Sequence, residues 1–137
     1  MDQAGAPARA SGWLLVLCRL LIVGHPLTLA VTAPNALNAV ALRGAAVAVV
    51  LVVRLLVVAF GVAAGRALQN IRPGGVGLAK TALLLSAATD VFVYTTPYYP
   101  NNRLPGDTTL YVAASLVYHS AWLAYLCRSR RVRALRL

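Results

Sequence analysis

Acidic residues are almost absent from this chain. Its 137 residues include no glutamate and three acidic residues in all, against thirteen lysines and arginines, so the formal net charge is +10. Few carboxylates are available to pair for general acid and base catalysis, and no serine, cysteine or lysine nucleophile lies in a pattern with an orienting base. We therefore predict that the protein is not an enzyme.

Metal ligands are also scarce. Cys18 and Cys127 have no neighbour at metal-ligand spacing, and the two histidines are joined by one aspartate, Asp90, in the apolar part of the chain. This set is too small to favour a metal ion, and an arginine close to it would repel a cation. The sequence predicts neither a metal site nor a cofactor.

Long apolar runs are what the chain does have, since 60% of its residues are hydrophobic and only 12% are charged. A bilayer core about 30 Å thick needs about 20 apolar residues in a helix. Four runs meet this length, and they lie approximately at residues 13–33, 44–64, 76–96 and 109–127. We predict an all-α integral membrane bundle of four transmembrane helices, with residues 1–12 as a disordered lead and residues 34–43 as the first connection.

Positive residues are distributed unevenly between the predicted connections. With the N-terminus in the cytoplasm, the outer loops hold Arg43 and Arg103, whereas the inner segments hold most of the others. Because positive residues accumulate on the cytoplasmic side, this asymmetry predicts that both termini are cytoplasmic. Residues 128–137 then form a basic tail that anchors the topology and attracts anionic lipid headgroups through Arg128, Arg130, Arg131, Arg133 and Arg136. No aromatic interleaving or recognition fold accompanies these arginines, so we do not expect nucleic-acid binding.

The first apolar run has a second interpretation, as a cleaved signal peptide. It has a basic start, and the residues AVTA at positions 30–33 resemble a small-residue cleavage site. Arg19 interrupts the apolar core, and the run is long enough to span the membrane, which favours retention of the helix. The later helices keep their orientation in either case.

Proline and glycine mark three places in the chain. Pro26 falls inside the first run, where a kinked helix is tolerated if a hydroxyl such as that of Thr28 or Thr32 satisfies the freed carbonyl. Residues 70–77, rich in glycine, predict a flexible turn, since their spacing matches no nucleotide-binding fingerprint. In the proline-containing loop after the third helix, the tyrosine pair at positions 98–99 is expected at the membrane interface.

Small residues follow one face of the second and third predicted helices. In the second helix, Gly61 and Gly65 share a stripe with Arg54, and in the third helix Ala82 and Ser86 have the same spacing. Small residues four apart let helix backbones approach closely in lipid. We predict that both stripes pack against other helices, within the bundle or between molecules, and that Arg54 faces a helix.

Four ionisable residues fall at membrane depth. Arg54 lies about 15 Å inside the outer end of the second helix and Asp90 about 9 Å inside that of the third, a difference that an arginine side chain can cover. An unpaired arginine at mid-bilayer costs about 2.5 to 3.5 kcal/mol, which favours an Arg54–Asp90 pair. His25 and His119 fall at a similar depth on the first and fourth helices. The four residues together would suit a proton relay or a small polar cavity, although each histidine alone is more typical of a hydrogen bond between helices.

Three stretches of the chain carry a resemblance to one known family. They are Gly12, Trp13 and Leu14; Arg72, Pro73, Gly74 and Lys80; and Tyr125, Leu126, Ser129, Arg130, Arg131 and Val132. At these positions the chain resembles the small bacterial four-helix membrane proteins grouped as domain of unknown function 2569. It departs from them near its end, where the family pattern has a threonine followed by an aromatic residue and this chain has Ala134, Leu135 and Arg136. The resemblance implies four helices with an uncleaved first helix, and no known chemistry.

Two functions are compatible with these observations. A four-helix unit of this size seldom encloses a pathway alone, so we expect a non-enzymatic membrane component that acts through oligomerisation or through other membrane proteins. The alternative is a small permease or proton-linked carrier that uses Arg54, Asp90, His25 and His119. The richness in alanine, valine, leucine, arginine and glycine is typical of a high-GC bacterial genome, so we expect a bacterial inner membrane, with the lipid bilayer as a partner.

Overall fold

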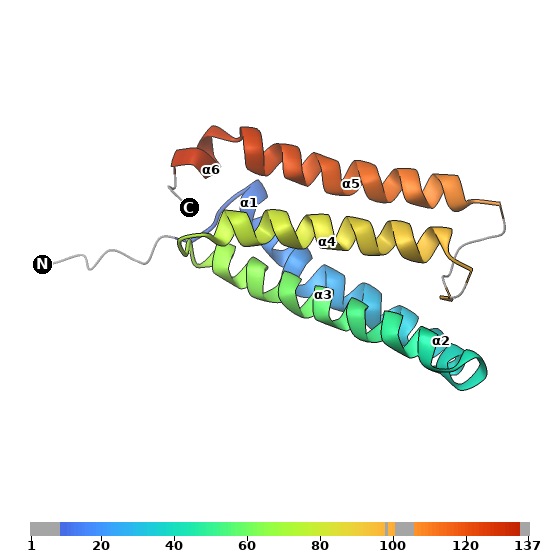
Figure 1. Ribbon diagram of the computed structural model, residues 1–137. Helices are drawn as coiled ribbons and strands as arrows, with labels where there is room; N and C mark the ends of the chain where they lie inside the picture. The colour runs from blue at the N-terminus through green and yellow to red at the C-terminus, as the bar shows by residue number, and fades with distance from the viewer. Residues whose placement is uncertain (1–8, 98, 101–105, 135–137) are drawn as a thin grey trace, which may run out of the picture.

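The chain is entirely helical and irregular, without strands, over the residues that the computed structural model describes, which are 9–97, 99–100 and 106–134 (Figure 1). The elements are α1 (Trp13–Arg19), the π-helical turn η1 (Leu20–Gly24), α2 (His25–Arg43), α3 (Ala45–Gln69), α4 (Gly75–Thr95), α5 (Thr108–Arg128) and α6 (Arg130–Ala134). In this part of the chain four helical stretches are long and apolar enough to cross a membrane: α1 to α2 as one stretch, α3, α4 and α5. The predicted all-α class with four membrane helices is confirmed, and the chain is a multi-pass membrane protein.

The first membrane helix is longer than the sequence predicts. It continues without a break to Arg43, so residues 34–43 are helical and are not the expected connection. Pro34 lies inside α2, where it removes one hydrogen bond without ending the helix. The helix continues because Ala36 and Ala39 are buried against α3 and α4. The predictions for the other spans match α4 and α5 closely, and α3 extends about one turn further than expected.

The proline in the middle of the first membrane helix is accommodated by η1. The His25 N–H donates to the Leu20 carbonyl, five residues back, so the helix is locally widened just before Pro26. Widening gives room to a ring that would otherwise clash with the carbonyl four residues earlier. Thr28 Oγ1 donates to the His25 carbonyl at 2.8 Å, and Thr32 Oγ1 donates to carbonyls of its own preceding turn. The prediction that Thr28 or Thr32 satisfies the carbonyl freed by Pro26 is therefore wrong. Both hydroxyls donate to other carbonyls, further along the helix.

The helices pack around two apolar cores at opposite ends. The first core lies where α1 begins, α3 ends, α4 begins and α5 ends, and we call this the proximal end; its largest members are Leu14, Leu17, Leu21, Leu68, Leu83 and Leu126. The second core lies at the other, distal end and contains Ala36, Ala39, Val47, Val93 and Tyr99. In Figure 1 the proximal end is at the left, and α2 and α5 diverge toward the distal end. The most polar part of the interior lies between the two cores.

The small residues predicted to pack helices lie inside the bundle. Gly61, Gly65, Ala82 and Ser86 are all buried. A Cβ atom at Gly65 would come within 2.9 Å of Ile22 Cγ1 and within 3.2 Å of the Cys18 carbonyl oxygen. The first membrane helix therefore crosses α3 at a separation that only glycine permits without a shift.

A hydrogen-bonded turn joins α3 to α4 where the sequence predicts a turn. The Arg72 N–H donates to the Ala67 carbonyl at 2.9 Å and the Ile71 N–H donates to the Leu68 carbonyl at 3.2 Å, which together form a Schellman motif. Ile71 occupies the left-handed position with φ of 51°, where a β-branched residue is strained. The turn holds Arg72 back against the end of α3.

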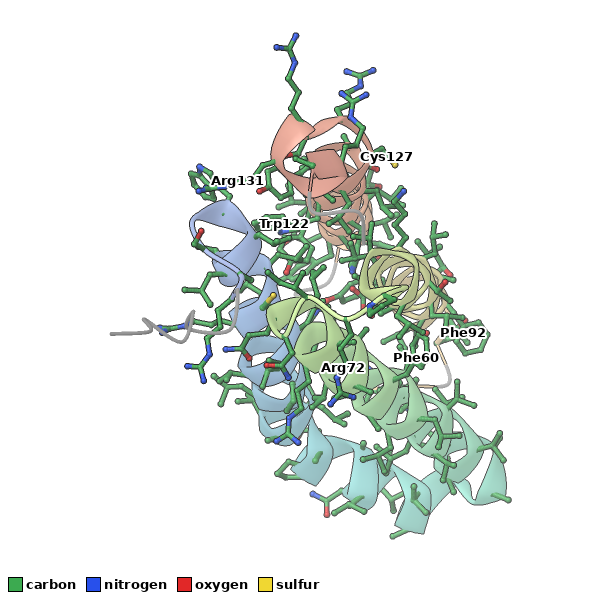
Figure 2. All side chains as sticks on the ribbon, turned by 90° about the vertical axis from the view of Figure 1, so that its left-hand side faces the viewer. Phe60, Arg72, Phe92, Trp122, Cys127 and Arg131 are labelled. Atoms are coloured by element: carbon green, nitrogen blue, oxygen red, sulfur yellow. The ribbon has the colours of Figure 1, made fainter. Side chains whose placement is uncertain are left out.

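Parts of the predicted lead and tail are packed against the proximal core. Ala10 is buried and its N–H donates to the Gln69 carbonyl at 3.1 Å. At the other terminus, α6 buries Val132 in the same core, and Arg131 lies against the start of α1 (Figure 2). The prediction of disorder is therefore wrong for residues 9–12, because the core covers Ala10. Residues 130–134 of the predicted basic tail form α6, which the core holds through Val132.

Four of the five basic residues singled out in the predicted tail lie among the described residues. Arg128, Arg130, Arg131 and Arg133 are exposed at the proximal end, whereas Arg136 lies outside the described residues, as do positions 1–8 of the predicted lead. The first and third of the stretches that carry the family resemblance meet at this end, since Leu14, Leu126 and Val132 share the proximal core.

Candidate intramembrane polar site

A cavity of about 390 Å³ lies between the two cores and is lined by all four ionisable residues that the sequence singled out. The first membrane helix contributes His25, α3 contributes Arg54, α4 contributes Asp90 and α5 contributes His119. Its other polar lining residues are Thr28, Ser86, Thr89, Tyr94, Tyr111, Ser115 and Tyr118. The cavity therefore concentrates charged and hydrogen-bonding groups inside a bundle whose outer surface is largely apolar.

Arg54 and Asp90 form the predicted ion pair. Arg54 Nη2 lies 3.9 Å from Asp90 Oδ1, and the two side chains are 15% and 28% exposed. The other carboxylate oxygen, Asp90 Oδ2, accepts a hydrogen bond from Ser115 Oγ at 2.9 Å. A distance of 3.9 Å is near the upper limit for a salt bridge. Each charged group can therefore also interact with another polar group.

Tyr99 is a second contact of Arg54, which the sequence did not reveal. The guanidinium carbon lies 5.5 Å from the centre of the Tyr99 ring, within the range of a cation–π interaction. Tyr99 is only 2% exposed and belongs to the distal core, so its side chain packs inside the bundle. Its location at the membrane interface stays a prediction. Tyr98 of the same pair lies outside the described residues. The inward turn of this loop is supported by Arg43 Nη1, which donates to the Pro97 carbonyl at 2.9 Å.

His119 is the most deeply buried of the four ionisable residues, at 4% exposed. Its Nδ1 lies 2.8 Å from the Ser115 carbonyl oxygen and 3.3 Å from Ser115 Oγ. A bond to the carbonyl requires a proton on Nδ1, which leaves Nε2 of the neutral ring as an acceptor. Nε2 is buried and has no hydrogen-bond partner among the described residues. An unpaired buried acceptor is costly, and such groups mark strained or functional positions.

His25 approaches His119 from the other side of the bundle. The two ring centres are 6.4 Å apart and the rings are inclined at 64°. His25 Nδ1 also lies 3.5 Å from Ser86 Oγ. Polar groups therefore follow one another across the site from His25 through His119, Ser115 and Asp90 to Arg54.

The site can bind a small polar molecule or hold a proton. It offers a fixed positive charge, a carboxylate, hydroxyls and two imidazoles. Among the residues that the structure describes, no three histidine, cysteine or acidic side chains lie close enough to hold a metal ion. The chemistry open to this site is hydrogen bonding, charge pairing and proton exchange.

Ser115 connects Asp90 and His119, and the sequence analysis did not single it out. Ser115 and His119 are four residues apart and so share one side of α5. The spacing of Ser115 and His119 can be read from the sequence. The hydrogen bond from Ser115 to Asp90 cannot, because it depends on how α5 packs on α4, which no local pattern specifies.

Comparison of the chain with known protein families, curated proteins and solved structures found no match.

Proposed function

We propose that this multi-pass membrane protein is a small permease or proton-linked carrier that binds a polar solute, a proton or both at Arg54, Asp90, His25 and His119. The observation that supports this function is that all four side chains line one cavity within the membrane-spanning helices. Ionisable groups at membrane depth are costly and belong in most cases to solute or proton pathways. We propose no enzymatic activity.

The same packing weakens the case for association through the small-residue stripes. Gly61, Gly65, Ala82 and Ser86 are buried within the bundle, so these residues do not offer a face to another molecule. A membrane component that acts through partners or as an oligomer remains the second candidate. Its support is an exposed pair of small residues, Ala59 and Ala63, on the outer side of α3.

The orientation and the family are part of this proposal. The exposed basic residues at the proximal end support a cytoplasmic location for both termini, in a bacterial inner membrane. The grouping of the Gly12–Leu14, Leu126 and Val132 positions at that end supports the resemblance to domain of unknown function 2569.

Proton movement is the direct test. The purified chain is placed in liposomes with a pH-sensitive dye inside, and proton entry is driven by a potassium diffusion potential. We expect Asp90→Asn and His119→Gln to lower the rate by roughly tenfold or more, since a proton crossing the membrane needs ionisable groups at depth. Asp107→Asn is the matched control, because it removes the same carboxylate outside the cavity, and it should leave the rate unchanged.

Two further measurements make the test decisive. Membrane abundance and melting temperature of each variant show whether a lost rate reflects lost protein. Thermal stabilisation of the parent by a panel of small polar solutes at several pH values tests binding without transport. A parent protein with neither proton flux nor stabilisation by any solute would contradict the carrier and leave the component as the better account.

A further inference from the structure

A second hollow, separate from the polar cavity, lies on the outer face of α3 at the proximal end. It encloses about 490 Å³ and is lined mainly by Ala59, Ala63, Arg66, Ala67, Asn70 and Arg72. None of these residues lines the polar cavity. The hollow combines an apolar floor with a cationic end, and the proposed carrier function uses neither.

The floor of the hollow matches one leaflet of a bilayer in length. Ala59, Ala63 and Ala67 lie one turn apart on the same side of α3, where their small side chains leave a groove. From Ala59 to Asn70 the helix rises about 16 Å. Half of a hydrocarbon core is about 15 Å, so the groove runs from the membrane surface to about the bilayer centre.

Two arginines close the end of the groove that lies at the membrane surface. Arg66 is in the last turn of α3 and is exposed. Arg72 reaches the same place because the turn after α3 folds back through the strained left-handed Ile71. Figure 2, which faces this end, shows Arg72 at the end of α3. The turn at the end of α3 thus brings Arg72 to the same hollow as Arg66.

Among the described residues, no acidic side chain lies at the proximal end to balance the charge around this hollow. The acidic residues that the structure describes are Asp90 and Asp107, and both belong to the distal half. A ligand that completes the hollow must therefore bring negative charge to Arg66 and Arg72.

We propose that this hollow binds an anionic phospholipid, with the phosphate of the headgroup on Arg66 and Arg72 and one acyl chain along the alanine groove. An arginine guanidinium can donate two parallel hydrogen bonds to the oxygens of one phosphate. Basic pockets at the ends of membrane helices are suited to anionic headgroups. A free phosphate would leave the apolar groove unused. A second copy of the chain, related by a two-fold axis, would bring these arginines toward their own copies, and like charges oppose such a contact.

Native mass spectrometry of the full chain in detergent tests the lipid site. Phosphatidylglycerol and phosphatidylethanolamine with identical acyl chains are added separately, and the retained lipid is counted for each variant. We expect the parent to retain phosphatidylglycerol preferentially, and Arg66→Gln with Arg72→Gln to weaken that retention by roughly tenfold or more. Arg9→Gln with Arg19→Gln removes equal charge at exposed positions of the N-terminal segment and α1, outside the hollow, and should change it little. Ala63→Phe, which fills the groove at an exposed position, should weaken retention with both arginines intact.

Each other outcome overturns the proposal. Equal retention of the two lipids, or equal loss in the control pair, would mean that the arginines act only through general surface charge. Displacement of the lipid by inorganic phosphate, together with no effect of Ala63→Phe, would indicate a site for a free anion. A dimer in the parent that Ala63→Phe abolishes would identify a second copy as the occupant.

Discussion

Arg54 is a charged side chain near the centre of a hydrophobic helix, and three features make this position stable. Asp90 lies 3.9 Å away, the Tyr99 ring lies 5.5 Å away, and the guanidinium borders a polar cavity. Asp90 in turn holds a hydrogen bond from Ser115. The two partners of the ion pair are therefore supported unequally, because the carboxylate has a second strong contact and the guanidinium has a weaker one.

Replacing the charged pair should show this asymmetry. We expect Asp90→Leu to lower stability by about 2 to 3 kcal/mol, since it leaves Arg54 without a counter-ion in the membrane. Arg54→Leu should cost less, because Asp90 retains Ser115. The double replacement should recover much of the loss, since an apolar pair of similar size is often as stable as a buried ion pair. The melting temperatures of the parent, the two single variants and the double variant, measured in one detergent, form a double-mutant cycle. If the losses of the two single variants add up in the double variant, the two residues do not interact.

Two substitutions distinguish the contribution of the Tyr99 ring to stability from that of its hydroxyl. Tyr99 Oη is buried without a partner among the described residues, so Tyr99→Phe should keep or raise the melting temperature. Tyr99→Leu removes the cation–π interaction and should lower stability by about 1 kcal/mol. A Phe variant as unstable as the Leu variant would show that the hydroxyl, and not the ring, holds this loop against Arg54.

At the scale of elements, the crossing of the first membrane helix over α3 determines the shape of the bundle. The two helices are in tight contact at Gly65, where an added Cβ would meet atoms of α1 and η1. The crossing also places His25 next to Gly61. A Cβ atom added at Gly61 would lie 3.6 Å from His25 Nδ1. A change at Gly65 is therefore expected to disturb the cavity as well as the packing.

Gly65→Ala and Gly77→Ala form a matched pair that tests this crossing. The added methyl group at Gly65 would meet three atoms at 3.2 Å or less, whereas at Gly77 it would meet nothing within 4 Å. We expect Gly65→Ala to cost about 1 to 3 kcal/mol through overpacking. Gly77→Ala should be neutral or slightly stabilising, because alanine is the better helix former. Thermal unfolding of both proteins in detergent measures the difference, and equal melting temperatures would mean that the helices do not cross so closely.

At the scale of the whole molecule, composition and residue spacing were sufficient to predict the four membrane helices and the meeting of Arg54 with Asp90. The prediction depended on hydrophobic length and on the short link between neighbouring antiparallel helices, and both are local properties. The extension of α2 beyond Pro34 was missed because packing of Ala36 and Ala39 outweighs the proline signal. The burial of Tyr99 was missed for a related reason, since it depends on a cation that lies 45 positions earlier in the chain.

The cavity itself could not be derived from the sequence. It lies where α2 and α3 diverge from α4 and α5 toward the distal end (Figure 1), which is a property of helix crossing angles. The sequence showed that four ionisable residues share a depth in the membrane, and only the packing shows that they surround one space.

The central claim of this account is that this space admits polar molecules from water, and thiol labelling tests it most directly. In a chain with Cys18→Ala and Cys127→Ala, single cysteines are introduced as Ser115→Cys in the cavity and as Leu85→Cys on the apolar outer face of α4. A membrane-impermeant, charged thiol reagent is then applied to the protein in sealed vesicles, and labelling is followed by mass spectrometry. We expect the cysteine at position 115 to react and the cysteine at position 85 to remain unlabelled. Absence of labelling at position 115 from either side of the membrane, with the protein folded, would contradict a solute-accessible site.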